Sequence, residues 1–366
     1  MIINKIKLYY KKFVYFFFKI FYGSVKGTLE PPYNHREIDQ EEIKVNDCNY
    51  KIFTCKDSVL YTDTIHDTAV IKNNKIIEGP SFQYRKNINK HSSFNSVLTK
   101  GTPKIRKVIN GNVYSLLVGG GGNSNYWHWL FDVLPKLQIF RNSNYFQEQS
   151  YFLFPSLDQN FQNQSLDILG VPKKNRLSSK VFRHFKADKI IITNHPYNFL
   201  NDPNKDSLNI PLWIFEFIKK SFLKNSIINL RKNKQFPKKI YISRKDGTAL
   251  RYIINETEVK NLLLKHGFEE LILSEYDFAS QINIFHHAET VVGLHGAGFA
   301  NILFCKKGTK ILELKPLTAG EIIKNVSIKN KLNYSDITVQ SKSINFKDQS
   351  GDIIIDLKKL MNKIKN

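Results

Sequence analysis

The sequence is poor in cysteine. Its 366 residues include three cysteines, Cys48, Cys55 and Cys305, which form neither a CxxC pair nor a metal-ligand spacing. An odd number of scattered cysteines argues against a disulfide framework and favours a reducing compartment. A bridge between Cys48 and Cys55 has no support from the surrounding sequence, so we expect no disulfide framework.

Several catalytic and ligand-binding motifs are missing as well. No GxxxxGK[ST] occurs, and the glycine turn described below does not fit GxGxxG, so neither the P-loop nor the dinucleotide fingerprint applies. The absence of GxSxG removes the nucleophile elbow of esterases. The chain has no DxD, so a divalent-metal clamp for a nucleotide diphosphate lacks obvious ligands, and His286 and His287 are adjacent rather than spaced for zinc. We therefore expect no metal site and no cofactor.

Acidic residues are scarce relative to basic ones. The chain has 55 Lys plus Arg against 32 Asp plus Glu, a formal net charge of +23. Such a surplus favours polyanionic partners, among them nucleotides, anionic lipid and charged glycan. An abundance of Lys, Asn and Ile, typical of AT-rich coding sequence, is an alternative source of the same charge. No nucleic-acid motif such as RNP1 or C₂H₂ is present, and we expect no nucleic-acid partner.

No apolar run is long enough to cross a bilayer. The run from Phe13 to Phe18 stops at Lys19, far short of the ~20 residues that a spanning helix needs. The chain shows no small-residue cleavage site of a secretory signal. Residues 1–25 interleave lysines with Phe and Tyr, which is typical of a segment lying on an anionic membrane surface. An amphipathic helix packed on the domain is the alternative.

Apolar runs of strand length alternate with helical patterns over most of the chain. Hydrophobic residues make up 42 %, and the length suffices for two globular domains. Residues 50–79 contain short β segments with a hairpin turn at Asn73-Asn74, and a strand at 113–118 runs into four glycines and a helix. We place a domain boundary near residue 205. The second half then predicts, in order, helix 212–223, a strand leading into a basic loop over 238–246, helix 256–267, strand 268–277, helix 277–288, strand 289–296, helix 297–308, strand 309–316 and an amphipathic helix 352–365. This succession predicts a doubly wound α/β fold with a parallel sheet.

The stretch TVVGLHGAGFANILF, residues 290–304, places a histidine between glycines at the end of a predicted strand. In open α/β sheets, ligands bind outside the carboxyl ends of the strands, and helix N-termini there carry partial positive charge. We interpret His295, Gly296, Ala297 and Gly298 as a cradle that lets the backbone approach a diphosphate closely. A glycine turn that only packs a helix on the sheet is the alternative.

Other polar residues follow neighbouring strands. Ser243 and Arg244 end the strand YIS, and Arg251 lies on the next loop, where a hydroxyl and guanidinium groups suit phosphate oxygens. Glu313 ends a further strand and can accept hydrogen bonds from a ribose diol; Glu275 is a weaker candidate of the same kind. The alternatives are a solvated basic loop and surface charges.

A second constellation, NSNYWHWLFDVLPKL, lies in the first half. His128 and Asp132 are four residues apart and share one helix face. The carboxylate can orient the imidazole and stabilise its charged form, which prepares it as a general base. Pro135 is expected to bend or end the helix. A core helix with a hydrogen-bonded histidine is the alternative.

Together these motifs resemble glycosyltransferase family 61. The resemblance rests on NYWHWLFDVLPKL, YISR and VVGLHGAGFANILF…ILEL, and it covers roughly residues 113–316. The family includes bacterial capsular-polysaccharide proteins, plant xylosyltransferases and animal O-linked GlcNAc-transferases. It implies a GT-B architecture, in which two Rossmann-like domains face each other across a cleft. It also implies an inverting transfer, usually from a UDP-sugar, without an essential metal.

The resemblance assigns residues only where they match its motifs. The implied donor-binding residues are Ser243, Arg244, Arg251, His295, Gly296, Ala297, Gly298, Asn301 and Glu313. His128 and Asp132 fall in the family's His-Trp helix, and which of them is the base stays open. The expected organisation is a membrane-surface segment 1–25, an acceptor-side domain 26–205, a donor domain 206–345, and a C-terminal helix 346–366 that can cross back to the first domain.

These features predict a bacterial glycosyltransferase of capsular polysaccharide or lipopolysaccharide biosynthesis. It would be cytoplasmic and peripheral on the inner face of the plasma membrane, with a lipid-linked or cell-surface polysaccharide acceptor. There are two rival hypotheses. One is a nucleotide-dependent phosphotransferase, which the absent P-loop and metal carboxylates disfavour, and the other is a non-enzymatic polyanion-binding or membrane scaffold protein. The latter explains the charge but not the glycine–histidine turn.

Overall fold

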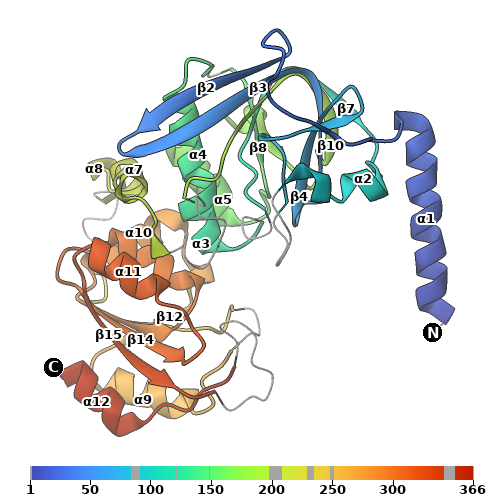
Figure 1. The fold of residues 1–366 in the computed structure, drawn as a ribbon. Helices are drawn as coiled ribbons and strands as arrows, with labels where there is room; N and C mark the ends of the chain where they lie inside the picture. The colour runs from blue at the N-terminus through green and yellow to red at the C-terminus, as the bar shows by residue number, and fades with distance from the viewer. Residues whose placement is uncertain are drawn as a thin grey trace. The chain divides into compact units, whose positions relative to one another are not determined.

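The protein divides into two compact units, each described here by itself. Unit 1 comprises residues 1–162 and 170–196, and unit 2 comprises residues 163–169 and 197–366. The predicted boundary near residue 205 falls outside the described residues. The computed structural model describes residues 2–83, 91–119, 123–147, 149–197, 208–228, 235–247, 251–341 and 351–365 (Figure 1).

Unit 1 is built on a mixed ten-stranded sheet. Its strand order is β1-β5-β4-β3-β10-β7-β8-β9, with β2 paired to β3 and β6 to β4. The strands are β1 Thr28–Leu29, β2 Ile38–Val45, β3 Cys48–Thr62, β4 Asp67–Lys72, β5 Lys75–Ile77, β6 Phe82–Gln83, β7 Lys107–Ser115, β8 Tyr151–Phe154, β9 Arg176–Ser178 and β10 His184–Thr193. Strand β10 runs antiparallel to β3 and parallel to β7, so it joins an antiparallel half to a parallel half.

Helices accompany this sheet along the chain. They are α1 Ile2–Tyr22, η1 Ser92–Phe94, α2 Val97–Lys100, α3 Tyr126–His128, the π-helix η3 Trp129–Val133, α4 Leu134–Arg141 and η4 Lys173–Asn175. Helix α5 Asn160–Ile168 begins in unit 1, and its residues from 163 on belong to unit 2. None of the helices in the described part of the chain is long and apolar enough to cross a bilayer.

The hairpin turn at Asn73-Asn74 is as the sequence predicts, whereas strand β3 is longer than expected. Residues Asn73 and Asn74 both have positive φ, as a two-residue hairpin turn requires, and they join β4 to β5 as predicted. The short β segments expected at the start of residues 50–79 are instead one long strand, β3, which pairs with β2, β10 and β4. A single residue of positive φ, Asp57, interrupts its regular backbone without ending it.

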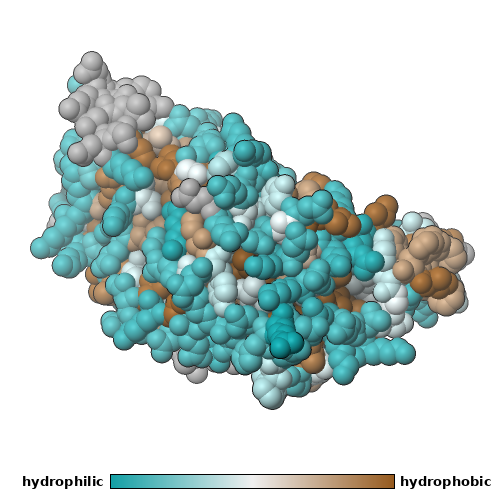
Figure 2. All heavy atoms as spheres, turned by 90° about the horizontal axis from the view of Figure 1, so that it is seen from above, coloured by the Kyte–Doolittle hydropathy of each residue, from teal (hydrophilic) through white to brown (hydrophobic). Residues whose placement is uncertain are grey.

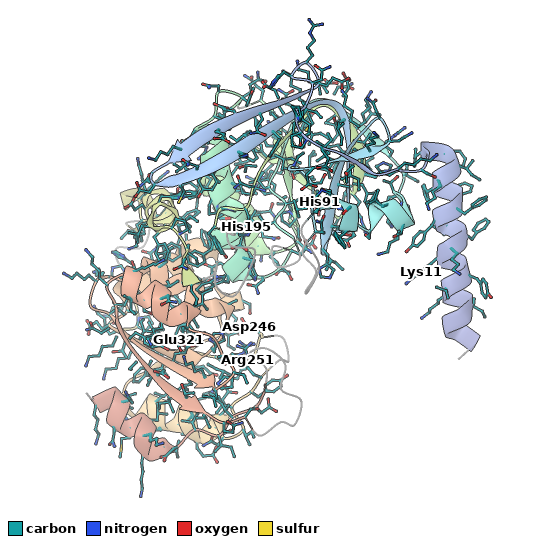
Figure 3. All side chains as sticks on the ribbon, viewed as in Figure 1. Lys11, His91, His195, Asp246, Arg251 and Glu321 are labelled. Carbon is teal, nitrogen blue, oxygen red and sulfur yellow. The ribbon has the colours of Figure 1, made fainter. Side chains whose placement is uncertain are left out.

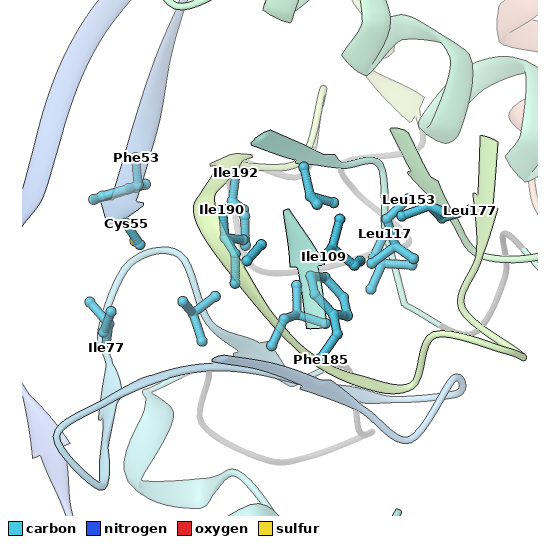
Figure 4. Close-up of a cluster of buried hydrophobic side chains, with 14 of the residues drawn as sticks. Phe53, Cys55, Ile77, Ile109, Leu117, Leu153, Leu177, Phe185, Ile190 and Ile192 are labelled. Carbon is cyan, nitrogen blue, oxygen red and sulfur yellow. The ribbon is translucent and has the colours of Figure 1, made fainter. Parts of the chain in front are cut away.

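The core of unit 1 lies where the two halves of the sheet meet. Ile190 and Ile192 of β10 point to the same face and pack with Phe53 and Cys55 of β3 (Figure 4). The three cysteines are free, as their spacing predicts. Burial raises the pKa of the Cys55 thiol to about 12, so it remains a protonated apolar group.

Unit 2 contains a five-stranded sheet in which all strands are parallel. The strands are β11 Lys239–Ile242, β12 Glu269–Leu271, β13 Thr290–Leu294, β14 Lys310–Pro316 and β15 Asn333–Val339. Their order is β12-β11-β13-β14-β15, so the chain winds first one way from β11 and then the other. This is a doubly wound order whose switch point lies between β11 and β13.

Helices cover both faces of this sheet (Figure 1). They are α7 Leu212–Phe222, α8 Asn225–Ile228, α9 Glu256–Lys265, η6 Leu273–Glu275, α10 Phe278–His287, η7 Ala297–Phe304, α11 Ile322–Lys329 and α12 Leu357–Lys365. On one face, Val292 and Leu312 pack against Val259 of α9 and Leu360 of α12. Successive side chains of β13 and β14 point to opposite faces of the sheet. Because helices cover both faces, these strands are buried on both sides.

The structure differs from the elements predicted for unit 2 in three places. The C-terminal helix begins at Leu357 rather than Asp352, and it packs on α9 and β15 of its own unit instead of crossing to the first domain, because Leu360 is buried in the core of unit 2. The strand expected at 268–277 ends at Leu271 and is followed by the 3₁₀ turn η6. The sequence also did not predict α11 and β15, which complete the sheet.

The helix after the glycine–histidine turn is a 3₁₀-helix rather than an α-helix. Gly298 has low helix propensity, and the Asn301 side chain donates to the Gly298 carbonyl at 3.3 Å. The same amide donates to Gln281 Oε1 of α10 at 3.1 Å. Asn301 therefore has a structural role, holding η7 to α10.

Candidate functional site

The glycine–histidine turn and the serine–arginine pair meet at the switch point of unit 2. Ile242, the last residue of β11, pairs with Gly293 of β13. Ser243 and Arg244 therefore follow one strand where His295 follows its neighbour. This edge of a doubly wound sheet is where ligands bind, and the structure brings the two predicted motifs together there.

Two guanidinium groups converge on one backbone carbonyl at this point. Arg244 Nη1 donates to the His295 carbonyl oxygen at 3.0 Å, and Arg251 Nη1 donates to the same oxygen at 2.7 Å. Arg251 is only 5 % exposed, and burial together with the neighbouring Arg244 lowers its pKa to about 10. Both side chains remain cationic near neutral pH. Two cations this close favour an anion that shares their charge.

Polar side chains of the following loop lie at the same end of the sheet. Figure 3 labels Asp246 and Arg251, which lie on either side of the loop after β11 in the chain. The Asp246 carboxylate accepts from the Ser274 backbone N–H at 2.9 Å, which ties the loop after β11 to η6. Ser243 is 2 % exposed, so its hydroxyl lies inside the fold rather than on a solvated loop.

Protein atoms fill the space beside the glycines. A Cβ on Gly296 would lie 2.2 Å from Arg244 Nη1, and one on Gly298 would lie 2.9 Å from Leu273 Cδ1. The backbone of Gly296 is extended, with φ 170°, so close approach rather than an unusual φ requires the glycine. Gly298 allows the turn to pack closely against Leu273, as expected for a glycine turn that packs a helix on the sheet. Gly296 instead leaves room for the Arg244 guanidinium. Contact between this backbone and a diphosphate stays a prediction.

Glu313 is fully buried, and protein side chains contact both of its carboxylate oxygens. His295 Nδ1 pairs with Oε1, and the Tyr334 hydroxyl donates to Oε2 at 2.5 Å. Burial and the charge of Glu313 raise the pKa of Tyr334, which keeps it a donor. Glu313 thus fixes the His295 ring through its Nδ1, and the ribose contact expected for Glu313 stays a prediction. Tyr334 lies on β15, which the sequence did not predict.

The second constellation forms a histidine–carboxylate pair in unit 1. Asn125 caps α3 by accepting from the Trp127 N–H, and His128 ends that helix. His128 Nδ1 lies 2.6 Å from Asp132 Oδ2. The intervening turn is a π-helix, closed by the Leu134 N–H on the Trp129 carbonyl. Pro135 explains it, because proline has no N–H to donate and its ring excludes a regular turn before it.

The electrostatics of this pair suit a general base. Burial lowers the pKa of His128, but the charge and hydrogen bond of Asp132 outweigh it and raise the pKa above its ordinary value. Asp132 stays ionised because its histidine partners lower its pKa despite the opposing effect of burial. The His128 side chain is 39 % exposed and that of Asp132 6 %. Since Nδ1 faces Asp132, Nε2 is the atom that can take a proton from a substrate.

Two further residues lie near this pair, His195 beside Asp132 and Lys136 near His195, and the sequence did not single them out. His195 Nε2 lies 3.6 Å from Asp132 Oδ2, and burial lowers the pKa of His195. Lys136 is 1 % exposed and donates from Nζ to the Leu117 carbonyl at 2.9 Å, and burial lowers its pKa to about 7. The spacing of Lys136, four residues after Asp132, is a sequence signal that could have placed it near this helix face. His195 has no such signal, because only the sheet brings the end of β10 to this helix.

Another group of ionisable residues gathers in unit 1. Nitrogen and carboxylate atoms of Glu30, Glu78 and His91 lie within 4.8 Å of one another. His91 Nδ1 accepts from the Ser93 N–H, so in the neutral ring Nε2 carries the proton and faces Glu30 Oε1 at 3.3 Å. Glu78 accepts from the Ser92 N–H. The three groups are accounted for by these hydrogen bonds, and we assign no metal to them.

Comparison with known proteins agrees with the resemblance. A family model described as Glycosyltransferase 61 matches residues 126–312, which is 187 of the 366 residues. The matched range contains His128 and Asp132 in unit 1 and Arg244, Arg251 and His295 in unit 2. No curated protein matches the chain.

Proposed function

Because this chain belongs to glycosyltransferase family 61, we propose that it is an inverting glycosyltransferase that uses a nucleotide-sugar donor, specifically a UDP-sugar. Family membership supports a sugar donor and a glycan acceptor in general. The acceptor that we propose is a lipid-linked or cell-surface polysaccharide of a bacterial capsule or lipopolysaccharide.

The paired guanidinium groups of Arg244 and Arg251 are the observation that carries the donor assignment. They lie at the switch point of a doubly wound sheet, beside His295. A leaving nucleoside diphosphate gains negative charge as the glycosidic bond to it breaks, and fixed cations stabilise that charge. Unit 2 would then be the donor domain.

His128 is the base that we propose for the acceptor. The acceptor hydroxyl oxygen attacks the anomeric carbon, its proton passes to His128 Nε2, and the bond to the diphosphate breaks with the electron pair leaving on phosphate. A single displacement inverts the anomeric carbon. Asp132 holds the ring through Nδ1 and balances the imidazolium charge. This choice between the two residues follows from their exposure, since Asp132 is buried behind the ring.

We also propose a GT-B architecture and a location at the plasma membrane. The two units would form the two domains of a GT-B enzyme, with unit 1 on the acceptor side. Arginines rather than a metal would neutralise the diphosphate, so no cofactor is needed. The enzyme would act in the cytoplasm, on the inner face of the plasma membrane, where lipid-linked acceptors are exposed.

Titration calorimetry with UDP tests the donor site. Substituting Arg244→Ala removes one charge-assisted donor, and we expect affinity to fall by about 100-fold. Arg36→Ala, which removes an exposed arginine of unit 1, is the matched control and should leave affinity unchanged. Full affinity in the Arg244→Ala protein would contradict the site. Binding of heparin without any nucleotide binding by the unaltered protein would favour the polyanion-binding alternative.

A further inference from the structure

The N-terminal helix α1 displays an exposed stripe of large apolar side chains. Six of them recur at spacings of three and four residues and thus share one helix face. Each is between 45 % and 69 % exposed. They are Ile6, Tyr9, Phe13, Phe16, Phe17 and Ile20. In Figure 2, hydrophobic side chains gather at the right-hand end of the view, where α1 lies in Figure 1.

The opposite face of α1 makes the contacts with unit 1. The Tyr22 ring meets His184 edge to face, with centroids 5.0 Å apart, and the Arg106 guanidinium lies 4.7 Å over the same ring. Lys19 Nζ donates to the Thr99 carbonyl at 2.9 Å. A helix that packed on the domain by its apolar face would bury the stripe. Here the helix is attached by its last turns, and the stripe faces away.

The charge of α1 indicates what covers the stripe. The helix contains no acidic residue, and Lys7, Lys11 and Lys12 are exposed (Lys11 is labelled in Figure 3). Lys12 borders the stripe, whereas Lys7 and Lys11 lie toward the opposite face. Two copies packed stripe to stripe would place two basic helices without any acidic residue side by side, and their like charges would repel each other. An anionic lipid surface attracts them, and Phe and Tyr side chains suit the boundary between headgroups and acyl chains.

We propose that α1 lies flat on an anionic bilayer, with the aromatic stripe inserted, Lys12 at the lipid phosphates beside it, and Lys7 and Lys11 adding to the positive charge of the helix above the surface. Its attached face then keeps unit 1 at the membrane surface. The inference rests on the proposed function only in its consequence, which is that a lipid-linked acceptor is held near the acceptor-side unit. Membrane binding itself depends on α1 alone.

Vesicle flotation of the full-length protein tests this assignment. The probes are vesicles of phosphatidylcholine with about one-third phosphatidylglycerol and vesicles of phosphatidylcholine alone, each at low and high salt. The stripe variant is Phe13→Ser with Phe16→Ser and Phe17→Ser. The charge variant is Lys7→Gln with Lys11→Gln and Lys12→Gln. The matched control is Leu317→Ser with Ile328→Ser, which removes two exposed apolar side chains from unit 2.

We expect the unaltered protein and the control to bind the anionic vesicles. The partition coefficient should fall by roughly 100-fold in the stripe variant, through lost apolar area, and by a similar factor in the charge variant. High salt should weaken binding of the unaltered protein. Equal binding by the stripe variant would overturn the proposal. So would a vesicle-free dimer that the stripe variant converts to a monomer, because a second copy would then cover the stripe.

UDP affinity measured on the same proteins separates this inference from the proposed function. The α1 variants should bind UDP as the unaltered protein does. If no form bound UDP while flotation behaved as expected, the donor assignment would fall and the membrane helix would stand.

Discussion

Arg244 occupies the space that a side chain on Gly296 would need. A Cβ there would lie 2.2 Å from Nη1, and the same nitrogen donates to the His295 carbonyl at 3.0 Å. The glycine at this turn is therefore a condition for the arginine's position. Arg244 and His295, which are 51 residues apart in the chain, thus belong to one structural unit.

Gly296→Ala should impair donor binding more than folding. The methyl group would displace the end of a flexible side chain, which costs little stability, but it would move the guanidinium away from the anion site. We expect UDP affinity to fall by about 10-fold or more and the unfolding free energy to change by less than about 1 kcal/mol. Calorimetry and urea unfolding measure the two quantities. Gly320→Ala, at a site with no atom within 4 Å, is the control; the assignment fails if both variants bind UDP equally.

Tyr334→Phe should destabilise unit 2. The substitution removes the hydroxyl that donates to the buried Glu313 carboxylate, and an oxygen left without its donor costs about 1–3 kcal/mol. Urea unfolding should show this loss, and UDP affinity should weaken because Glu313 also holds His295. Tyr252→Phe removes the hydroxyl of an exposed tyrosine and should cost almost nothing. Equal stability of the two variants would argue against the Tyr334–Glu313–His295 arrangement.

The pH dependence of kcat/KM should report His128. The base must be unprotonated, so activity should rise with pH through the pKa of His128, which Asp132 holds above the ordinary value of about 6.5. In Asp132→Asn the charge is lost and burial remains, so the acidic limb should move to lower pH while kcat falls. Histidine NMR titration follows the same pKa without turnover. A limb that does not move would exclude the pair as the base.

Lys136→Met should remove a pH-dependent part of the stability. Burial lowers the pKa of folded Lys136 to about 7, and the unfolded side chain has a pKa near 10.4. Between these values only the unfolded chain holds the proton, so raising the pH favours the folded state. The unaltered protein should gain roughly 2–4 kcal/mol relative to the variant from pH 7 to 10. Chemical unfolding at several pH values measures this difference, and a constant difference would show that Lys136 keeps its proton.

Turnover should withstand EDTA. If Arg244 and Arg251 neutralise the diphosphate, chelation removes nothing that the reaction needs. Activity with a nucleotide-sugar donor before and after chelation measures this directly. Strict dependence on an added divalent ion would contradict the proposed role of the arginines.

The predictions made from the sequence agree best with the structure where a feature depends on residues close together in the chain. The Asn73-Asn74 turn, the break before Pro135 and the spacing of His128 and Asp132 are all set within a few residues. The sequence predicts a helix over residues 297–308, and the structure has one at Ala297–Phe304. Gly298 and the side-chain bonds of Asn301, which depend on α10, made it a 3₁₀-helix.

The sequence by itself determined which chemical groups follow the strands and to which family the chain belongs, because strand ends, glycine turns and helix spacing are written in short segments. Only the tertiary structure decided the strand order that joins Arg244 to His295, the burial of Glu313 between His295 and Tyr334, the approach of His195 to Asp132, and the outward direction of the α1 stripe. These contacts connect residues far apart in the chain. Sheet register and packing fix them, and neither can be derived from local patterns alone.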